Sequence, residues 1–266
     1  MTDDMNDERF LGYVEMHAET ERHLFSRHHV NRLHALAGVP LPAPSYGDFL
    51  GMGSDYVRPL IEKARVPLRA AARAADTKAL HGQLRAMLLQ RSVRTDRTFT
   101  LKSGKLSNFF VDCKQTALTA NGHHLAGCIL LRALDEHFPN VETVAGVALG
   151  GCPLASAVST LSAHQSEDWP HPYALNALYV REARKDHGTS RRIEGPIDDT
   201  RLHVVLLEDV VTTGGSSLAA CDALTEEGCR VLGVIALVDR EEGATEAFAA
   251  REIPLRAIFT QTELRA

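Results

Sequence analysis

The residue types best suited to chemistry lie together between Leu202 and Ser217, in the sequence LHVVLLEDVVTTGGSS. Its aliphatic run, Val204 to Leu207, predicts a buried parallel strand, and the carboxylates Glu208 and Asp209 follow directly. The glycine- and hydroxyl-rich residues after them lead into a helical pattern, where backbone N–H groups and the helix dipole favour an anion. The acidic pair suits the hydroxyls of an attached sugar, or a magnesium ion that bridges sugar and phosphates. The stretch therefore predicts a site for a ribose 5-phosphate group with a cation nearby.

Other known uses of such a stretch fit less well. A strand-to-helix turn with N-capping hydroxyls needs no ligand, but the two carboxylates directly ahead of Thr212 to Ser217 favour a binding site. A Walker A loop needs a lysine after its last glycine, and no lysine follows Gly215. The spacing of a dinucleotide-binding G-x-G-x-x-G motif is also absent from this stretch.

Composition limits the class of protein. With 266 residues, 44% of them hydrophobic and 24% charged, the chain is long enough for one large domain, or one domain plus an appendage. A net charge of −5 gives no reason to expect a nucleic-acid or membrane partner, and no apolar run is long enough to cross a bilayer. The acidic N-terminus lacks the apolar segment of a secretory signal. The five cysteines are odd in number and form no C-x-x-C pair, so we expect them to be reduced in a cytoplasmic protein.

Residues 1–77 differ from the rest and predict a helical N-terminal extension. A helical period runs from Phe10 to Ala37, residues 38–44 form a stiff proline-rich linker, and Tyr56 to Ala75 predicts a second helix that Pro67 kinks or divides. Four histidines lack the spacing of an H-E-x-x-H metal motif, which favours a solvated or interface-facing helix; they are His23, His28, His29 and His34. The sequence assigns no role to the extension: covering the remaining domain and helping subunits to associate are both open.

From Lys78 to Ala266 the pattern alternates between helix and strand. A helix at Leu80 to Gln90 precedes two short strands, Arg97 to Leu101 and Asn108 to Asp112. Later strands are predicted at 143–147, 177–180, 203–208, 230–237 and 255–259, and helices at 118–137, 152–163, 214–227 and 245–250. Such alternation implies right-handed crossovers and a mostly parallel sheet covered by helices, with ligands at the carboxyl ends of the strands.

Two further loops at predicted strand ends suit a polyphosphate. Gly146 to Leu154, GVALGGCPL, offers a glycine-rich turn before a helix that begins at Pro153, although a close strand-to-helix turn explains it almost as well. The segment from Tyr179 to Gly195 contains the basic residues Arg181, Arg184, Lys185, His187, Arg191 and Arg192. A mobile cationic loop after a strand can close over phosphates, and the basic excess favours this lid over a solvated surface loop.

Two more segments suit a flat, charged substrate. The stretch from Phe99 to Phe110, FTLKSGKLSNFF, places Lys102 and Lys105 on a tight turn beside rings that can pack on a heterocycle. In VDREEG, Arg240 ends a predicted strand, and its planar guanidinium matches a carboxylate. A surface ion pair between this arginine and one of the two glutamates that follow, Glu241 or Glu242, is the alternative.

Together these motifs resemble those of the orotate phosphoribosyltransferases, type I enzymes that use 5-phosphoribosyl 1-diphosphate (PRPP). The resemblance rests on TLKSGK, on Arg181 with the KDHG of Lys185 to Gly188, on EDVVTTGGSS and on DREEG, and it covers Lys78 to Ala266. Type I enzymes for hypoxanthine or adenine share the PRPP motif but not the KSG turn with the later KDHG loop. The resemblance implies an α/β type I phosphoribosyltransferase fold at 78–266, with a central mostly parallel sheet flanked by helices and a small N-terminal hood.

The resemblance implies transfer of ribose 5-phosphate from PRPP to orotate, which gives orotidine 5′-monophosphate and diphosphate in pyrimidine (UMP) synthesis. It implies catalytic roles for Lys102, Lys185, His187 and Asp209. It also implies substrate contacts from Glu208, Val210, Val211, Thr212, Thr213, Gly214, Gly215 and Ser216. In the same way, Arg181 would bind diphosphate, Arg240 the orotate carboxylate, and Phe109 or Phe110 would lie against the base.

A Mg²⁺ cofactor, held mainly by PRPP with Asp209 as a candidate ligand, is implied too, as is a homodimer whose lid reaches the partner's site. Two positions depart from the family pattern: Gly150 stands where a lysine is common, and Glu182 stands where a second basic residue often follows the arginine. Both changes remove positive charge beside the diphosphate, and Arg184 offsets part of the loss. The alternatives are a transferase for another nucleobase and a non-catalytic PRPP-sensing regulator; the retained lid residues argue against the regulator.

Overall fold

The computed structural model describes residues 6–19, 27–39, 54–100, 106–163, 173–181, 192–197 and 202–266. The chain divides into two compact units, Met1–Lys78 and Ala79–Ala266. One helix, α3 (Ser54–Arg91), contributes residues to both. The predicted boundary after residue 77, with a separate role for each part, stays a prediction.

The first unit is helical. It contains α1 (Asp7–Glu19), α2 (Arg27–Leu36) and the first part of α3. Its core consists of apolar side chains from all three helices: Phe10, Leu11, Val14, Ala18, Val30, Leu33, Val57, Leu60, Ile61 and Ala64. The helical period predicted from Phe10 to Ala37 thus belongs to two helices, and residues 20–26 lie outside the described ones.

Two of the four histidines of the extension have described side chains, and both contribute to packing. The ring centroid of His29 lies 6.0 Å from that of Phe10 and 5.7 Å from that of Tyr13. His34 is buried, and its Nδ1 lies 3.1 Å from the carbonyl oxygen of Val39. These contacts give both residues a structural role. Among the described residues, no group of three His, Cys, Asp or Glu side chains could hold a metal ion.

The helix α3 spans 38 residues, so the prediction of two helices, 56–75 and 80–90, was wrong. The helix continues through Pro67, which removes one backbone N–H without dividing the element. Between the two predicted helices, the Thr77 hydroxyl donates to the carbonyl oxygen of Arg73 at 2.7 Å, a bond compatible with a helix interior. None of the described helices is both long and apolar enough to cross a membrane.

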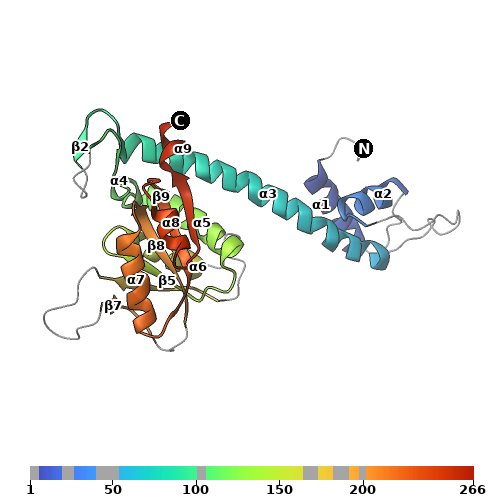
Figure 1. Ribbon diagram of the computed structural model, residues 1–266. Coiled ribbons are helices and arrows are strands. Elements are labelled where there is room, and N and C mark those ends of the chain that lie inside the picture. Colours follow the sequence, from blue (N-terminus) through green and yellow to red (C-terminus); the bar gives the residue numbers. More distant parts are fainter. Residues whose placement is uncertain are drawn as a thin grey trace. The chain divides into compact units, whose positions relative to one another are not determined.

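The second unit is built on a six-stranded sheet in the order β10-β9-β8-β5-β6-β7 (Figure 1). Its strands are β5 (Thr143–Val147), β6 (Asn176–Val180), β7 (Ile193–Glu194), β8 (His203–Val211), β9 (Arg230–Asp239) and β10 (Leu255–Thr260). Neighbouring strands are parallel, except that β7 runs antiparallel to β6. The sequence predicts the parallel strands closely, because each is a buried aliphatic run, but it misses the short edge strand β7.

Consecutive residues of a strand point to opposite faces of the sheet, and here both sets are apolar. Both faces are therefore covered by helices. One face packs against the last part of α3, α5 (Ala120–His137) and α6 (Gly151–Ala163), with Leu207 and Ile235 in that core. The other face packs against α7 (Gly215–Glu226) and α8 (Ala244–Ala249), with Leu206 and Val234 in its core. The predicted α/β class is confirmed.

Short strands form the predicted hood. β2 (Phe99–Thr100) pairs with β3 (Leu106–Ser107), and β1 (Val93–Arg94) pairs with β4 (Phe110–Val111), both antiparallel. The predicted strand at 108–112 therefore pairs with residues ahead of the hairpin rather than with the strand at 97–101. Two short helices, α4 (Lys114–Ala117) and α9 (Gln261–Arg265), were not predicted.

Candidate active site

The neighbouring strands β5 and β8 form a topological switch point. From β5 the chain continues to β6 on one side, and from β8 it continues to β9 on the other. In open α/β sheets, ligands bind outside the carboxyl ends of the strands at such a point. Residues 148–150 connect β5 to α6 there, and residues 212–214 connect β8 to α7. Both connections belong to the anion-binding segments predicted from the sequence.

The turn after β8 has a backbone suited to an anion. Gly214 has a φ of +80°, which glycine adopts without strain, and a Cβ there would lie 2.9 Å from the Phe248 ring. Gly215 begins α7, and no side chain caps the helix at Gly214, so the first N–H groups of α7 are open to a ligand. Thr213 and Ser216 are exposed at the same turn.

The strand β8 continues to Val211, past its predicted end at Glu208, because its pairing with β9 extends to Val211 and Asp239. This pairing holds the acidic pair within a rigid strand. The side chain of Val211 is buried in one core, and Val210 packs beside the other. Both valines could therefore meet a substrate through their backbone rather than their side chains.

Glu208 is buried and accepts a hydrogen bond of 2.7 Å from the hydroxyl of Ser217 in α7. Burial raises the pKa of Glu208 to about 8; the Ser217 bond acts in the opposite direction, and the charge of Asp209 adds to the increase. Glu208 thus ties the end of β8 to the first turn of α7. Asp209, whose side chain is 14% exposed, is the member of the pair that is more open to a ligand.

Replacing Glu208 with glutamine is expected to change how stability depends on pH. The pKa of Glu208 is higher in the folded protein than its ordinary value of 4.5. The stability that the residue contributes is therefore fully present below about pH 4.5. This contribution is lost as the pH rises through the folded-state pKa of about 8. The melting temperature of Glu208→Gln relative to the wild type should therefore rise between roughly pH 5 and pH 8.5. The exposed control Glu246→Gln should keep a constant difference in melting temperature from the wild type across this pH range. The same constant difference for Glu208→Gln would contradict the raised pKa of Glu208.

Asp209 lies between a glycine and a lysine. A Cβ at Gly150 would lie 2.0 Å from Asp209 Cγ, so the loop after β5 packs directly on the carboxylate. Lys114 Nζ lies 3.7 Å from Asp209 Oδ2 and 2.8 Å from Asp112 Oδ1. Neither Lys114 nor Asp112 was among the predicted site residues. The signal available in the sequence was an acid and a base, two residues apart, directly after a predicted strand.

Arg240 is buried beyond the end of β9 and contacts the hood. Its Nη2 lies 2.8 Å from Glu242 Oε1, 3.3 Å from the carbonyl oxygen of Phe109 and 3.4 Å from Ser107 Oγ. The ion pair considered from the sequence is thus present, although the guanidinium is buried rather than on the surface. Within the described part of the chain, Arg240 Nε is buried without a hydrogen-bond partner. That donor suits a substrate carboxylate.

The two aromatic candidates differ in exposure. Phe110 is 38% exposed and stacks on Phe99, with ring centroids 5.0 Å apart. Phe109 is fully buried, and the Arg265 guanidinium lies 5.1 Å from its ring centroid. Phe110 therefore has a ring face that can lie against a base, whereas Phe109 contributes its carbonyl oxygen to Arg240.

The C-terminal helix α9 braces this side of the site. Arg265 donates to the Asn108 side chain of the hood at 2.6 Å. The backbone N–H and the hydroxyl of Thr262 donate to Glu241, which follows Arg240, at 2.8 and 2.7 Å. The helix thus connects the hood to the loop that carries Arg240. The sequence motifs gave no signal for this contact.

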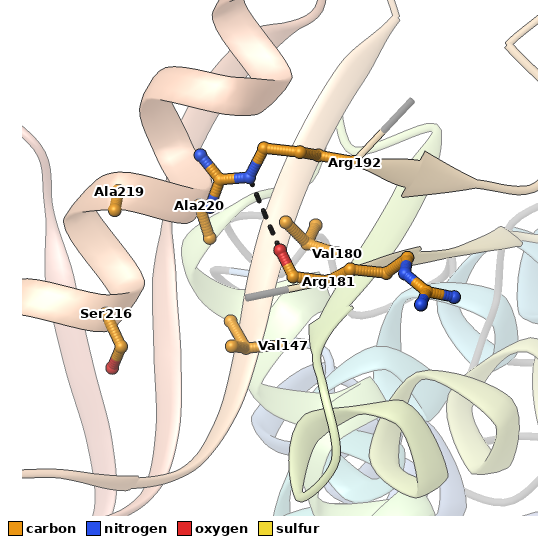
Figure 2. Close-up of a pocket in the computed structure, with 7 residues that line it drawn as sticks. All are labelled: Val147, Val180, Arg181, Arg192, Ser216, Ala219 and Ala220. Carbon is orange, nitrogen blue, oxygen red and sulfur yellow. Dashed lines mark hydrogen bonds between the residues drawn. The ribbon is translucent and has the colours of Figure 1, made fainter. Parts of the chain in front are cut away.

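A cavity of about 280 Å³ connects two of the predicted motifs (Figure 2). It is lined from α7 by Ser216, Ala219 and Ala220, from the ends of β5 and β6 by Val147 and Val180, and by Arg181 and Arg192. Arg192 Nε donates to the carbonyl oxygen of Arg181 at 3.4 Å, and the Arg181 guanidinium lies 3.6 Å from Glu194. Arg181 and Ser216, taken from separate motifs, therefore line one cavity.

Other predicted site residues lie outside the described residues. They are Lys102 and Lys105 of the KSGK sequence, and Arg184, Lys185, His187 and Arg191 of the basic segment; Glu182, the departure from the family pattern, lies outside them too. Their roles stay predictions.

Comparisons with known proteins agree with this geometry. The model of the phosphoribosyl transferase domain family matches residues 115–251. The orotate phosphoribosyltransferase of Sorangium cellulosum is 48% identical over 182 residues, which are 68% of this chain and 91% of the relative. The orotate phosphoribosyltransferase of Aeropyrum pernix superposes with a TM-score of 0.57 at 31% identity, over 68% of this chain and 95% of that one. The Mycobacterium tuberculosis enzyme in complex with PRPP gives a TM-score of 0.55 at 28% identity, over 70% and 99%.

Proposed function

The chain belongs to the phosphoribosyltransferase family, among the orotate phosphoribosyltransferases, and we infer that it transfers ribose 5-phosphate from PRPP to orotate. The products are orotidine 5′-monophosphate and diphosphate. The observation that carries this inference is one sheet edge with three matched groups: the uncapped start of α7, the partly exposed Asp209 and the buried Arg240. They match a phosphate, sugar hydroxyls and a carboxylate. The names of the similar proteins support the same substrates.

Each part of the two substrates has a proposed partner in this site. The turn from Thr212 to Ser216 binds the 5′-phosphate, and Asp209 accepts hydrogen bonds from the ribose hydroxyls. Glu208, which the sequence also assigned to the ribose, faces Ser217 in this structure and holds the start of α7. The guanidinium of Arg240 binds the orotate carboxylate, and the ring of Phe110 lies against the base.

The proposed reaction is a displacement at C1 of the ribose. As the bond from C1 to diphosphate breaks, C1 becomes oxocarbenium-like and negative charge gathers on the leaving group. N1 of orotate forms the new bond to C1 and loses its proton. Cations that meet the leaving group stabilise this charge as it develops; those proposed are Lys102, Arg181, Lys185 and His187. A closed lid also keeps water from hydrolysing PRPP. The reaction requires no covalent nucleophile.

We propose Mg²⁺ as the cofactor. Asp209 offers one partly exposed carboxylate at this edge, while Glu208 is engaged by Ser217. A single carboxylate fits this ion, because Mg²⁺ keeps several waters and binds substrate phosphates rather than a cage of protein ligands. When bound by PRPP and Asp209, it would neutralise charge on the diphosphate.

A homodimer with shared active sites, in the cytoplasm, completes the proposal. The support for the dimer is that the basic segment resembles the lid of the orotate phosphoribosyltransferases. In that family the lid reaches the active site of the partner subunit. In the described part of the chain the five cysteines form no disulfide, which suits a reducing compartment. Mixing the inactive variants Lys185→Ala and Arg240→Ala tests the shared sites: partial activity should return as mixed dimers form. Mixtures that stay inactive would mean that each site is built from one chain.

The experiment that tests the proposed function is diphosphate release from PRPP with Mg²⁺, comparing orotate with uracil, hypoxanthine and adenine. We expect release that depends on orotate and is lost in Lys185→Ala and Arg240→Ala. Release with another base would keep the reaction type but overturn the substrate. Binding of PRPP without release for any base would indicate the regulator instead.

A further inference from the structure

Lys114 is a cation of the candidate site that lies outside every motif used to predict it. It is the first residue of α4, and its side chain is 43% exposed. Its ammonium group lies between two carboxylates, 2.8 Å from Asp112 Oδ1 and 3.7 Å from Asp209 Oδ2. One of these carboxylates is thus the more exposed member of the acidic pair at the end of β8.

The loop after β5 also packs against Asp209. A Cβ at Gly150 would lie 2.0 to 2.2 Å from the carboxylate atoms of Asp209, closer than real Cβ contacts come. No side chain, and therefore no cation, can occupy position 150 while Asp209 keeps its place. In the described part of the chain, the side-chain cation that lies beside Asp209 is that of Lys114.

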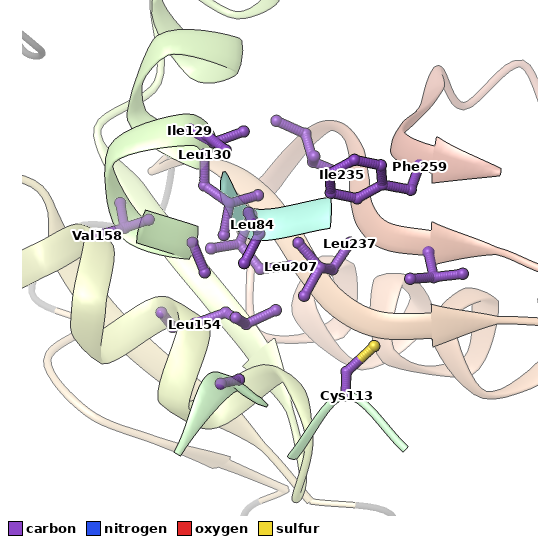
Figure 3. Packing of buried hydrophobic residues seen from close by; sticks show 14 of the residues in the cluster. Leu84, Cys113, Ile129, Leu130, Leu154, Val158, Leu207, Ile235, Leu237 and Phe259 are labelled. Carbon is purple, nitrogen blue, oxygen red and sulfur yellow. The ribbon is translucent and has the colours of Figure 1, made fainter. Parts of the chain in front are cut away.

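Lys114 is held by a preformed frame rather than by a chance surface contact. Asp112 accepts hydrogen bonds from the Lys114 backbone N–H at 3.3 Å and from the Gln115 side chain at 3.1 Å. Cys113, which lies between Asp112 and Lys114 in the sequence, is buried in the same core as Leu207 (Figure 3). Leu207 precedes Asp209 by two residues in β8. The two carboxylates lie 2.8 and 3.7 Å from the Lys114 ammonium group, and a lysine side chain is protonated at neutral pH. The lysine is therefore a fixed positive charge.

We propose that Lys114 is a positioning residue for the PRPP side of the reaction: its ammonium group holds the Asp209 carboxylate in place and offsets the negative charge of Asp112 and Asp209. This inference rests on the proposed function, in which Asp209 binds the ribose of a highly anionic substrate. Without the lysine, the Asp112 and Asp209 carboxylates present more negative charge to the incoming Mg²⁺–PRPP, and Asp209 loses its contact with the ammonium group. Orotate binds on the Arg240 side, so its affinity should depend on Lys114 much less.

The test compares Lys114→Met with Lys114→Arg and with Lys78→Met, an exposed lysine outside the site. The dissociation constant of PRPP, measured by calorimetry without orotate, should rise about tenfold in Lys114→Met and should largely recover in Lys114→Arg. The KM for orotate and the melting temperature should change little, because the Lys114 side chain is 43% exposed and belongs to neither hydrophobic core. Lys78→Met should behave as the wild type.

Two results would overturn the proposal. One is unchanged PRPP binding in Lys114→Met. The other is an equal loss of PRPP and orotate affinity with a lower melting temperature, which would mean that the lysine only supports the fold. Orotate-dependent release by the wild type is measured in parallel. If the wild type releases no diphosphate with any base, the proposed function fails, whereas the PRPP dissociation constants still decide the role of Lys114.

Discussion

Arg240→Ala is expected to lower kcat/KM for orotate by about 100-fold or more, the effect of removing one partner of a buried charged pair. The guanidinium is buried, and in the described residues its Nε lacks a partner, so a carboxylate that enters here gains a charge-assisted bond that water does not replace. Arg240→Lys should recover little of the loss, because an ammonium group lacks the planar fork. Steady-state kinetics with varied orotate measures the effect.

The control for this prediction is Arg256→Ala, which removes an exposed arginine of β10. Because Arg240 also contacts the Phe109 carbonyl oxygen, the PRPP dissociation constant of each variant must be measured alongside. An Arg240→Ala protein that binds PRPP as the wild type does, but has lost orotate, fits the proposed role. Equal losses for both substrates would assign Arg240 to the support of the hood instead.

Gly150→Ala should lower kcat/KM for PRPP by about 100-fold, because a displacement of about 1 Å at a reacting group has that effect. The added Cβ would overlap the Asp209 carboxylate at 2.0 to 2.2 Å, and Asp209 sits in a strand paired through Val211, so the side chain rather than the backbone must move. The melting temperature should change little, because the displaced carboxylate belongs to the site rather than to a hydrophobic core.

Gly82→Ala is the matched control, because a Cβ at this helical position would meet nothing within 4 Å. The double variant Gly150→Ala with Asp209→Ala makes the test sharper. If the alanine at 150 acts by displacing Asp209, it should add little to the loss caused by Asp209→Ala alone. Additive losses would show that Gly150 acts through some other contact.

Local patterns were sufficient to predict the sheet but not every boundary. The parallel strands are continuous aliphatic runs with turn residues at their ends, so each could be placed from sequence alone. The end of β8 depends on its register with β9, and the two-residue strand β7 depends on pairing with β6. Neither partner is visible in the local sequence. In α3, the expected effect of Pro67 was outweighed by helix-forming neighbours.

The site was predictable where one continuous motif builds it. The residues from Glu208 to Ser216 are contiguous, so strand, acidic pair and anion turn follow from the sequence order. The contacts of Asp209 with Gly150 and Lys114, however, join segments about 60 to 95 residues apart, and those of Arg265 with the hood join still more distant ones. Such contacts depend on the strand order, which composition and periodicity do not determine.

The helix α9 has a consequence for the order in which the protein assembles. The strands β5 and β8 and the helix α7, which hold the proposed phosphate and ribose contacts, all precede residue 230 in the chain. The brace on the base side, formed by Thr262 and Arg265, is synthesised after every strand of the sheet. A growing chain should therefore acquire affinity for PRPP once β9 has paired with β8, and affinity for orotate only after α9 has formed.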